Sequence, residues 1–539
     1  MKLTEEQDAI VQSDAELLKV NAFAGTGKTS TLVEYANARP KKRMLYLAFN
    51  KAIQVEAQGR FPSNVRSVTS HALAYRDHGS KYQNKLTPNL KANQIAQALD
   101  LVGKYEMQPH FALLAGQHIN ATLVRFFASK DACVTEAHVN MPPSMNANAH
   151  YDAALISALT QKLWEKMQSI NDPEVGMLHD GYLKLYQLSN PKLNYDHILF
   201  DESQDANPCT LDFVSKQDSH KVFVGDAHQS IYLFRGAVNA MQEIESTQEL
   251  ALTGSFRFGK FIAETANTIL YHMKGESRRI RGLGAQDELA PVQRTSPHAI
   301  ICRSNATVFD EAVVSMSLGR KVAFVGGPGS YTFDKVGDAY KLSTGEVGSI
   351  RDPYIRSFGT MENLEAFAET TDDRELKSLS RVVKKYGREI PMLIKAIKNS
   401  CVEQDKANVT LTTAHKSKGL EWDQVRLTDD YVELLNKQGN IQASTEVRAD
   451  ELNILYVAAT RAKLRLEVNG GLASFLLKAT EEPYGRMNAD MQAMLKKAAK
   501  APQAITSSAA IKNLVKSKKE DIKLQIFGGR FNPKRDLGL

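Results

Sequence analysis

One short stretch near the start of the chain constrains the fold more than any other, the sequence AFAGTGKT at residues 22–29. It follows an apolar run, Leu17 to Val20, and it precedes a segment with helical character, Ser30 to Ala38. A strand, a glycine-containing loop and a helix in this order form a phosphate-binding loop, whose backbone N–H groups wrap a polyphosphate. The pattern therefore predicts an α/β fold that binds a nucleotide.

The residues of this loop suit that role. Gly25 and Gly27 let the backbone adopt conformations that a side chain would forbid. Lys28 can reach the β- and γ-phosphates of ATP, and the Thr29 hydroxyl can hold Mg²⁺. Ala22 stands where the usual G-x-x-x-x-G-K-[ST] pattern has its first glycine, so an ordinary glycine-containing loop is the weaker alternative. We expect ATP and Mg²⁺ as cofactors, with nucleotide contacts from Ala24, Gly25, Thr26, Gly27, Lys28 and Thr29.

Composition sets wide bounds on the class of protein. At 539 residues the chain has room for three or four domains or subdomains, and 43% hydrophobic residues suffice for buried cores. Its net charge of +7 is compatible with nucleic acid but is common among proteins. The four cysteines lie far apart, which argues against a zinc module or disulfide framework and favours a reducing compartment. We therefore expect a cytoplasmic or nucleoid-associated protein, or a nuclear one in a eukaryote.

No targeting or membrane segment is expected. The first ten residues, MKLTEEQDAI, are acidic and polar, unlike a signal peptide. No apolar run approaches the length that spans a membrane, so we expect no membrane partner.

Short apolar strands alternate with helical patterns in two parts of the chain, which predicts two α/β units with parallel sheets. The expected strands are Met44 to Ala48, His197 to Phe200, Lys221 to Val224, Ala299 to Cys302, Val409 to Thr412 and Gln424 to Leu427. Two mostly helical insertions run roughly from Tyr75 to Leu178 and from Ser330 to Lys406. Residues 496–539 carry eleven Lys or Arg against three acids, which predicts a flexible basic tail that either contacts DNA or only solvates the chain.

A carboxylate pair follows the expected strand His197 to Phe200. In a P-loop ATPase the first acid, Asp201, completes the Mg²⁺ site, and the second, Glu202, orients or deprotonates the attacking water. Adjacent acids at a strand end are also common in solvated turns. The phosphate-binding loop elsewhere in the chain disfavours this alternative.

Residues 222–237, VFVGDAHQSIYLFRGA, place polar, aromatic and basic residues after a strand that ends at Gly-Asp. Gln229 can sense a γ-phosphate. Phe234 can stack on a base, because single-strand binders combine aromatic platforms with basic grooves. The alternative is that Tyr232 and Phe234 are core residues, the usual fate of isolated aromatics.

Further stretches follow the motif order of one helicase family. LTEEQ at residues 3–7 resembles the Q motif, AFAGTGKT resembles the family's A-x-A-G-[ST]-G-K-T loop, and DESQD at residues 201–205 is similar to motif II. The other matches are to motifs Ia (49–52), Ib (69–71), III (225–237), IV (255–257), V (413–422) and VI (451–463). The chain therefore resembles the superfamily 1 DNA helicases of the UvrD/Rep type over residues 3 to 463.

The resemblance implies roles for single residues. Gln7 would read adenine, Phe256 would stack on it, and Glu421 would contact the nucleotide. Arg257 and Arg461 would be arginine fingers that neutralise charge on the transferred phosphoryl group. Contacts to single-stranded DNA are expected from Phe49, Asn50, His71, Tyr232, Phe234, Arg235 and His415. The two histidines would otherwise be taken as structural, and only their motif positions favour DNA contact.

Within this family four more stretches, residues 21–33, 179–185, 234–240 and 309–313, are similar to the helicase core of the F-box DNA helicases. Only two residues precede Leu3, so we expect no F-box and carry over no ubiquitin-ligase assembly. Ala48 stands where the family often has a DNA-contacting phenylalanine, and Asn453 where an arginine is frequent. The second insertion is short, so regulation by that subdomain is not carried over.

The implied fold class is α/β, with two RecA-like P-loop domains, ATP between them and a mostly helical insertion in each. The first domain is expected at residues 1–75 and 179–250 with its insertion at 76–178. The second is expected at 251–330 and 405–480 with a short insertion at 331–404. The first would supply Lys28, Thr29, Asp201, Glu202 and Gln229, and the second would supply the arginine fingers.

Three functions from different classes fit these features. The first is an ATP-dependent DNA helicase that moves 3′→5′ on single-stranded DNA in replication, repair or recombination. The second is a translocase that mainly strips recombinase filaments. The third is a nucleotide-switched DNA-binding module with little turnover, which the Asp201-Glu202 pair disfavours. The expected partners are single-stranded DNA and its junctions with duplex, with recombinase filaments or a protein bound by the basic tail as alternatives; no nuclease-like acidic cluster follows residue 463.

Overall fold

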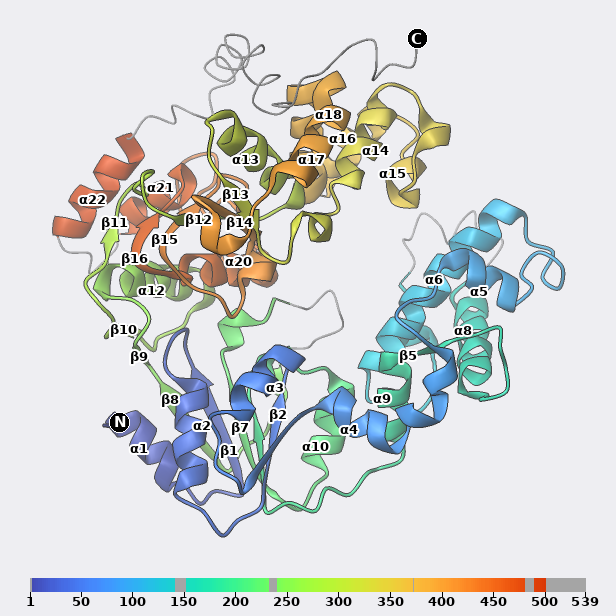
Figure 1. Ribbon diagram of the computed structural model, residues 1–539, viewed down its shortest axis with the longest axis horizontal. Coiled ribbons are helices and arrows are strands. Elements are labelled where there is room, and N and C mark those ends of the chain that lie inside the picture. Colours follow the sequence, from blue (N-terminus) through green and yellow to red (C-terminus); the bar gives the residue numbers. More distant parts are fainter. Residues whose placement is uncertain (1, 141–151, 232–239, 372, 480–488, 501–539) are drawn as a thin grey trace. The chain divides into compact units, whose positions relative to one another are not determined.

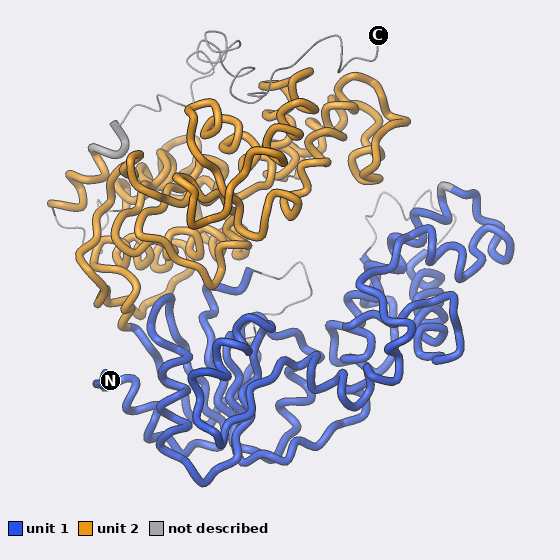
Figure 2. The backbone as a smooth tube through the Cα atoms, in the orientation of Figure 1, with its two compact units in different colours: residues 1–253 blue, residues 254–539 orange. Residues whose placement is uncertain are grey.

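The computed structural model describes residues 2–140, 152–231, 240–371, 373–479 and 489–500 (Figure 1). The chain divides into two compact units, residues 1–253 and 254–539, which Figure 2 colours blue and orange. Each unit is built around one six-stranded sheet whose paired strands are all parallel. Both units are therefore α/β, which confirms the fold class that the sequence predicts.

The first sheet has the strand order β3-β2-β6-β7-β1-β8. Its strands are β1 (Leu17–Ala22), β2 (Met44–Ala48), β3 (Val65–Thr69), β6 (His197–Phe200), β7 (His220–Gly225) and β8 (Gln248–Leu252). Strands β2 and β6 are buried along their whole length, as expected of strands covered on both faces. Because the strands are parallel, all of their carboxyl ends lie at one edge of the sheet, where ligands bind in such folds.

Helices accompany this sheet between its strands. They are α1 (Glu5–Gln12), α2 (Lys28–Asn37), α3 (Lys51–Gln58), α4 (Ser70–Asp77), α10 (Pro208–Ser215) and α11 (Ala240–Glu243). Two of them begin within three residues of the end of a strand through a side-chain cap: in α3 Asn50 accepts a hydrogen bond from the Ile53 N–H, and in α4 Thr69 accepts one from the Ala72 N–H. Such caps satisfy the exposed N–H groups of a helix start and fix where the helix begins.

A mostly helical insertion lies between β3 and β6. It contains α5 (Ala92–Ala98), α6 (Pro109–Ala128), α8 (Ala153–Gln168), α9 (His179–Leu188) and a small parallel sheet of β4 (Leu86–Thr87) and β5 (Met177–Leu178). The rings of Phe127 and Trp164 pack at 5.0 Å in its core. The same core includes Leu45 and Phe200 of the sheet, so the insertion is packed against the first unit rather than tethered to it.

The second sheet has the strand order β11-β16-β15-β12-β14-β13. Its strands are β11 (Glu288–Leu289), β12 (His298–Cys302), β13 (Val322–Phe324), β14 (Val409–Thr413), β15 (Trp422–Leu427) and β16 (Ala462–Glu467), and a separate pair is β9 (Gly254–Ser255) with β10 (Arg281–Gly282). The accompanying helices are α12 (Lys260–Lys274), α13 (Asn305–Ser317), α19 (Ala414–Ser417), α20 (Ala449–Ala459), α21 (Gly470–Ala479) and α22 (Ala489–Lys500).

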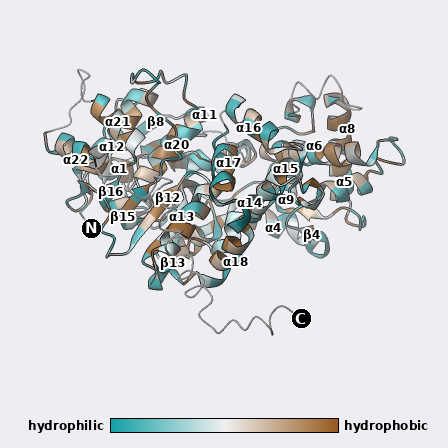
Figure 3. Ribbon diagram, turned by 90° about the horizontal axis from the view of Figure 1, so that it is seen from above, coloured by the Kyte–Doolittle hydropathy of each residue, from teal (hydrophilic) through white to brown (hydrophobic). Residues whose placement is uncertain are grey.

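The second insertion lies between β13 and β14. It contains α14 (Asp334–Ser343), α15 (Pro353–Ser357), α16 (Met361–Thr370), α17 (Arg374–Tyr386) and α18 (Ile390–Ser400). Its buried residues share one core with β12, β13 and β14. Teal and brown alternate along most helices in Figure 3, as expected of amphipathic helices that bury one face.

The sequence-derived strands are confirmed, with β7, β12, β14 and β15 each one or two residues longer than predicted. Strand β8 continues to Leu252 and pairs Leu252 with Ala22, so residues 251–252 lie in the first sheet rather than the second domain. Helix α2 begins at Lys28, two residues before the predicted start. Residues 496–500, predicted as the start of a flexible tail, form the last turn of α22, whose Met491 and Leu495 are buried; residues 501–539 of the tail lie outside the described residues.

Within the described ranges, no helix combines the length and the apolar character needed to cross a bilayer.

Candidate active site

The phosphate-binding loop has the local geometry that its glycines predict. Gly25 and Gly27 have φ values of 75° and 78°, and Gly27 is the residue from which α2 starts. A side chain at either position would be strained in this left-handed conformation. The Thr26 hydroxyl donates a hydrogen bond to the Phe23 carbonyl at 2.9 Å and closes the loop. Lys28 and Thr29 therefore occupy the first turn of α2, beside the loop amides.

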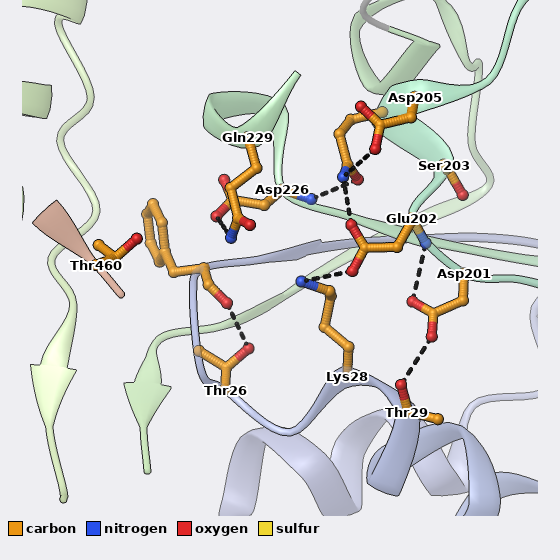
Figure 4. Close-up of polar contacts among 12 residues, drawn as sticks. Thr26, Lys28, Thr29, Asp201, Glu202, Ser203, Asp205, Asp226, Gln229 and Thr460 are labelled. Atoms are coloured by element: carbon orange, nitrogen blue, oxygen red, sulfur yellow. Dashed lines mark hydrogen bonds and ion pairs between the residues drawn. The ribbon is translucent and has the colours of Figure 1, made fainter. Parts of the chain in front are cut away.

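Lys28 faces a group of carboxylates. Its Nζ lies 3.3 Å from Glu202 Oε1 (Figure 4). Burial alone would lower the pKa of Lys28, but Glu202, Asp226 and Asp201 outweigh it and hold this pKa above its usual value. The lysine is therefore charged at neutral pH, as a phosphate-binding residue must be.

Asp201 lies at the end of β6 and receives two hydroxyl donors. Thr29 Oγ1 and the Tyr46 hydroxyl each donate to its Oδ2 at 2.8 Å. Burial and then repulsion from Glu202 raise the pKa of Asp201. A buried hydroxyl and carboxylate in contact are hard oxygen ligands of the kind that Mg²⁺ prefers. The residues present thus fit the cation that the sequence predicts.

Glu202 has an unusual backbone conformation. Its φ is 52°, in the left-handed region that residues with side chains seldom adopt. Its N–H donates to Asp201 Oδ1 at 2.9 Å. The sharp turn directs the two neighbouring carboxylates differently, since Asp201 contacts Thr29 while Glu202 contacts Lys28. Strained backbone of this kind is typical of functional sites.

A chain of polar contacts continues from Glu202 to Gln229 (Figure 4). Gln204 Nε2 donates to Glu202 Oε2 at 2.6 Å, and Gln204 Oε1 accepts from the Asp226 N–H at 2.9 Å. Gln229 Nε2 then donates to Asp226 Oδ2 at 2.7 Å. A Cβ at Gly225 would lie 2.5 Å from Gln204 Oε1, so only glycine allows this close approach. The residues predicted to bind and to sense the γ-phosphate are thus connected within one unit.

Gln7 lies beside the first turn of α2. It is buried, accepts from the Thr4 N–H at 3.0 Å and donates to Thr31 Oγ1 at 3.2 Å. The Q-motif glutamine thus forms part of the cap of α1 and contacts the helix that carries Lys28 and Thr29. Its predicted contact with adenine stays a prediction.

Arg257, in the second unit, forms its hydrogen bonds with residues of that unit. Its Nε donates to Glu421 Oε2 at 2.8 Å and its Nη1 to the Thr460 carbonyl at 3.2 Å. The neighbouring Phe256 is an exposed aromatic ring, which suits the stacking role that the resemblance implies. Two residues predicted from different motifs, Arg257 and Glu421, are thus brought together.

Arg461, the second predicted finger, is buried. Its Nε donates to the Val457 carbonyl at 2.9 Å and its Nη2 to Thr460 Oγ1 at 3.1 Å. Nη1 reaches the Leu420 carbonyl at 3.4 Å, which connects motif VI to motif V. The contacts give Arg461 a structural role within its unit beside the one predicted from its motif.

The predicted DNA contacts fall into three groups. Phe49 and Asn50 are exposed at the end of β2, and Asn50 also caps α3. His71, the second residue of α4, contacts Asp180, whereas His415 is half-buried in α19 of the second unit. Tyr232, Phe234 and Arg235 lie outside the described residues. The first unit therefore brings together Phe49, Asn50 and His71, because Ala48 and Thr69 are register partners on adjacent strands.

Sequence reasoning missed three residues of the site. Tyr46 donates to Asp201, and its signal was a lone hydroxyl in the apolar strand MLYLA. Gln204 and Asp226 form the link between motifs II and III. Both lie within stretches that resemble motifs, and both are buried. A buried polar side chain needs a hydrogen-bond partner, and this was the signal that could have identified them.

Two known domain families match parts of this chain. Residues 3–248 match the UvrD/REP helicase N-terminal domain, and residues 330–469 match the UvrD-like helicase C-terminal domain. The chain belongs to the UvrD/Rep helicase family. The two matched ranges include the phosphate-binding loop, both carboxylates of motif II, Glu421 and Arg461, whereas Phe256 and Arg257 lie between them.

Individual proteins similar to this chain are also named as DNA helicases. F-box DNA helicase 1 of Gallus gallus is 35% identical over 513 residues, 89% of this chain and 50% of that protein. F-box DNA helicase protein 1 of Schizosaccharomyces pombe is 35% identical over 508 residues, 87% of this chain and 57% of that protein. ATP-dependent DNA helicase srs2 of the same yeast is 27% identical over 347 residues, 56% of this chain and 38% of that protein. The chain thus spans about half the length of the two F-box relatives.

Proposed function

We propose that this protein is an ATP-dependent DNA helicase that moves 3′→5′ on single-stranded DNA. The observation that carries the proposal is the cluster of Lys28, Thr29, Asp201 and Glu202 in a chain of the UvrD/Rep family. A phosphate-binding lysine, a hydroxyl and carboxylate for a cation, and a second carboxylate for water are the parts of an ATPase site.

The contacts of the site suggest how nucleotide binding prepares hydrolysis. Lys28 pairs with Glu202 at 3.3 Å, and a triphosphate in the loop would compete with Glu202 for the ammonium group. Glu202 would then be released to accept a proton from the attacking water, held by its hydrogen bond from Gln204. Mg²⁺, held by Thr29 and Asp201, would neutralise charge on the phosphates. The carboxylate thus becomes available only when nucleotide is loaded.

The second unit would supply positive charge that stabilises the transition state of phosphoryl transfer. Arg257 and Arg461 are the proposed fingers, and Phe256 the proposed platform for adenine. Arg257 would have to leave Glu421 to reach a phosphate, so Glu421 holds the guanidinium in reserve in this state. The predicted role of Glu421 as a nucleotide contact is compatible with such an exchange.

DNA would bind at the carboxyl edge of the first sheet, at the ends of β2 and β3. The order of the strands places β3 four positions from β1, which at about 4.8 Å per strand separates the DNA end from the phosphate site by roughly 19 Å. The proposed partners are single-stranded DNA and its junctions with duplex, and the proposed compartment is the one that holds the DNA, the cytoplasm or, in a eukaryote, the nucleus. Replication, repair or recombination is the proposed context.

One assay tests activity and direction together. Purified full-length protein with ATP and Mg²⁺ is given duplexes of one sequence that carry a 3′ tail, a 5′ tail or no tail. We expect ATPase stimulated by single-stranded DNA and separation of the 3′-tailed duplex alone. Separation of only the 5′-tailed duplex would overturn the proposed direction.

Two outcomes would favour the other candidates. Stimulated ATPase with displacement of streptavidin from a biotinylated single strand, but with no strand separation, would indicate a translocase. Nucleotide-dependent DNA binding with negligible turnover would indicate a switched binding module. In the second case the role given to Glu202 would be wrong.

A further inference from the structure

Two aromatic rings lie exposed on one face of α4. The side chain of His71 is 41% exposed, and Tyr75, one helical turn later, is 39% exposed. Residues four apart lie on the same face of a helix. A solvent-exposed tyrosine with a fixed ring is a candidate contact surface rather than part of a core.

Both rings rest on the same buried residue. Tyr182 of α9 is 4% exposed, and its ring lies edge-on to His71 at 6.2 Å and to Tyr75 at 5.9 Å. The Tyr182 hydroxyl is itself within hydrogen-bond distance of His179 Nδ1 at 3.1 Å. A rigid buried ring that supports two exposed ones limits the motion of both.

Further contacts hold the two exposed rings in place. His71 Nε2 lies 2.9 Å from Asp180 Oδ1, which fixes the plane of the imidazole. A Cβ on Gly79 would lie 2.6 Å from Tyr75 Cδ2, so the tyrosine ring covers a glycine that leaves space for it. The face is therefore organised before any ligand binds, which lowers the entropy lost on binding.

The position of this face points to DNA. His71 follows β3, and Ala48 of β2 is the register partner of Thr69, so the exposed Phe49 and Asn50 emerge beside the start of α4. Tyr75 thus extends the group of predicted DNA contacts by one helical turn. Four residues of helix advance roughly 6 Å, whereas successive bases of a duplex strand are about 3.4 Å apart. The spacing suits an extended single strand and not a stacked duplex.

We propose that His71 and Tyr75, supported by Tyr182, form a two-ring platform on which neighbouring bases of single-stranded DNA stack. Tyr75 is then a DNA-contact residue that no family motif marks. The inference rests on the proposed function, because it takes the carboxyl edge of the first sheet as the DNA-binding edge.

The test compares three variants of the full-length protein, Tyr75→Ala, Tyr75→Phe and Tyr354→Ala. The probe is a fluorescein-labelled oligothymidylate, titrated at several salt concentrations. Tyr354, 46% exposed in α15 of the second insertion, is the matched control for losing an exposed tyrosine. DNA-free ATPase and thermal unfolding are measured for each variant, so that a folding defect is detected.

We expect Tyr75→Ala to weaken oligothymidylate binding by roughly 5- to 150-fold, the loss typical of one stacked base. Tyr75→Phe keeps the ring and should stay within about twofold of wild type, as should Tyr354→Ala. The salt dependence of binding should keep its slope in Tyr75→Ala, because no phosphate contact is lost. DNA-free ATPase should not change.

The failures of the two proposals are distinguishable. If the wild-type protein shows no ATPase stimulation by single-stranded DNA, the proposed function fails, and the platform fails with it. If stimulation is normal and Tyr75→Ala binds like wild type, the platform alone is wrong. Equal losses in Tyr75→Ala and Tyr354→Ala, or a flattened salt slope, would also overturn it.

Discussion

The two units share a six-stranded parallel sheet but differ in how their charged side chains are grouped. In the first unit one lysine, Lys28, faces three acids, and its pKa is raised by all of them. In the second unit two arginines are each paired with one acid, Arg257 with Glu421 and Arg303 with Glu451, whereas Arg461 donates to backbone carbonyls. The same architecture thus carries an excess of acid in one unit and balanced pairs in the other.

This difference indicates a division of labour. Acids grouped around one lysine are stabilised when cations and a phosphate ligand enter together, so the first unit has the composition of a binding site. Paired arginines are stable without a ligand, so the second unit can fold with its cations held in reserve. Substituting a charged group in one unit and measuring which activities the protein keeps tests this division of labour.

The largest effect is expected at Lys28 and Glu202. Lys28→Ala should abolish ATP hydrolysis, since the phosphates lose their main cationic partner, and Glu202→Gln should lower kcat by on the order of 10³ or more while ATP still binds. Turnover and nucleotide affinity are measured separately. Lys19→Ala is the matched control, because Lys19 on β1 pairs with Glu249 at 3.0 Å away from the loop. Near-normal DNA-stimulated ATPase in either site variant would refute the assignment.

The next effect concerns the arginines of the second unit. Arg257→Ala and Arg461→Ala should each lower kcat by on the order of 10³, with little change in nucleotide Kd, because a finger acts mostly in the transition state. Arg461 also donates to the Val457 and Leu420 carbonyls, so its removal could destabilise the fold. Arg461→Lys is therefore tested as well, and thermal unfolding is measured for both Arg461 variants. Arg303→Ala serves as the control, with lost stability but normal kcat per folded molecule. Unchanged kcat in Arg257→Ala would indicate that Arg257 has only a structural role, in its ion pair with Glu421.

A smaller effect is expected from Tyr46→Phe. Loss of the hydroxyl removes one of two donors to Asp201 Oδ2, so the Mg²⁺ concentration needed for half-maximal ATPase should rise by roughly 10-fold. Turnover at saturating Mg²⁺ should change only a few-fold. Tyr35→Phe is the control, since its hydroxyl contacts His197 Nδ1 at 3.1 Å instead. An identical Mg²⁺ requirement in both variants would remove Tyr46 from the cation site.

These residues show how far the sequence alone could go. The strands and the loop were predictable because buried parallel strands are short apolar runs, and because glycines and a lysine at fixed spacing have one common use. Tyr46 could not be assigned, since its contact with Asp201 exists only because β2 pairs with β6, and the two residues are 155 positions apart. No local pattern encodes strand order.

The same limit applies to the second unit. The arginines were found from their motifs, but the pairing of Arg257 with Glu421 joins residues 164 positions apart. Helix ends were also less predictable than strands, as α2 begins at Lys28 because Gly27 adopts a left-handed conformation that the apolar pattern does not register. Tyr75 had no motif at all, and only its exposure and its neighbours bring it to attention.

The smallest effect on turnover is expected from lowering the pH. His197, at the start of β6, is buried beside the His220 ring at 4.8 Å, and burial followed by the positive charges of His220, Arg39 and Lys42 lowers the pKa of His197 to about 4, with Asp196 opposing. A histidine that is neutral when folded stabilises the fold above its unfolded pKa of about 6.5, and this stability is lost as pH falls from there toward about 4.

Hydrogen exchange of the β6 amides, corrected for intrinsic rates, measures this loss. Between pH 7 and pH 5 the protection of β6 should fall by about 1–2 kcal/mol. His197→Gln cannot gain a proton, so its protection should be nearly constant over the same range. A parallel decline in both proteins would exclude His197 as the cause. Strand β12 begins with His298, whose pKa is also lowered by burial, and provides the comparison in the second unit.

The position of β1 in its sheet has a consequence for how the protein is made. Among the described residues, the strand that leads into the phosphate-binding loop pairs with β7 and β8 alone, although it begins at Leu17 and β7 begins at His220. A ribosome that adds 5–20 residues per second needs roughly 10–40 s to synthesise the intervening chain. During that time the first strand to emerge has no partner in its sheet, and its apolar side chains depend on whatever receives nascent chains in the cell. Both neighbours of β1 exist only once the chain has been synthesised to Leu252, the register partner of Ala22 at the start of the loop.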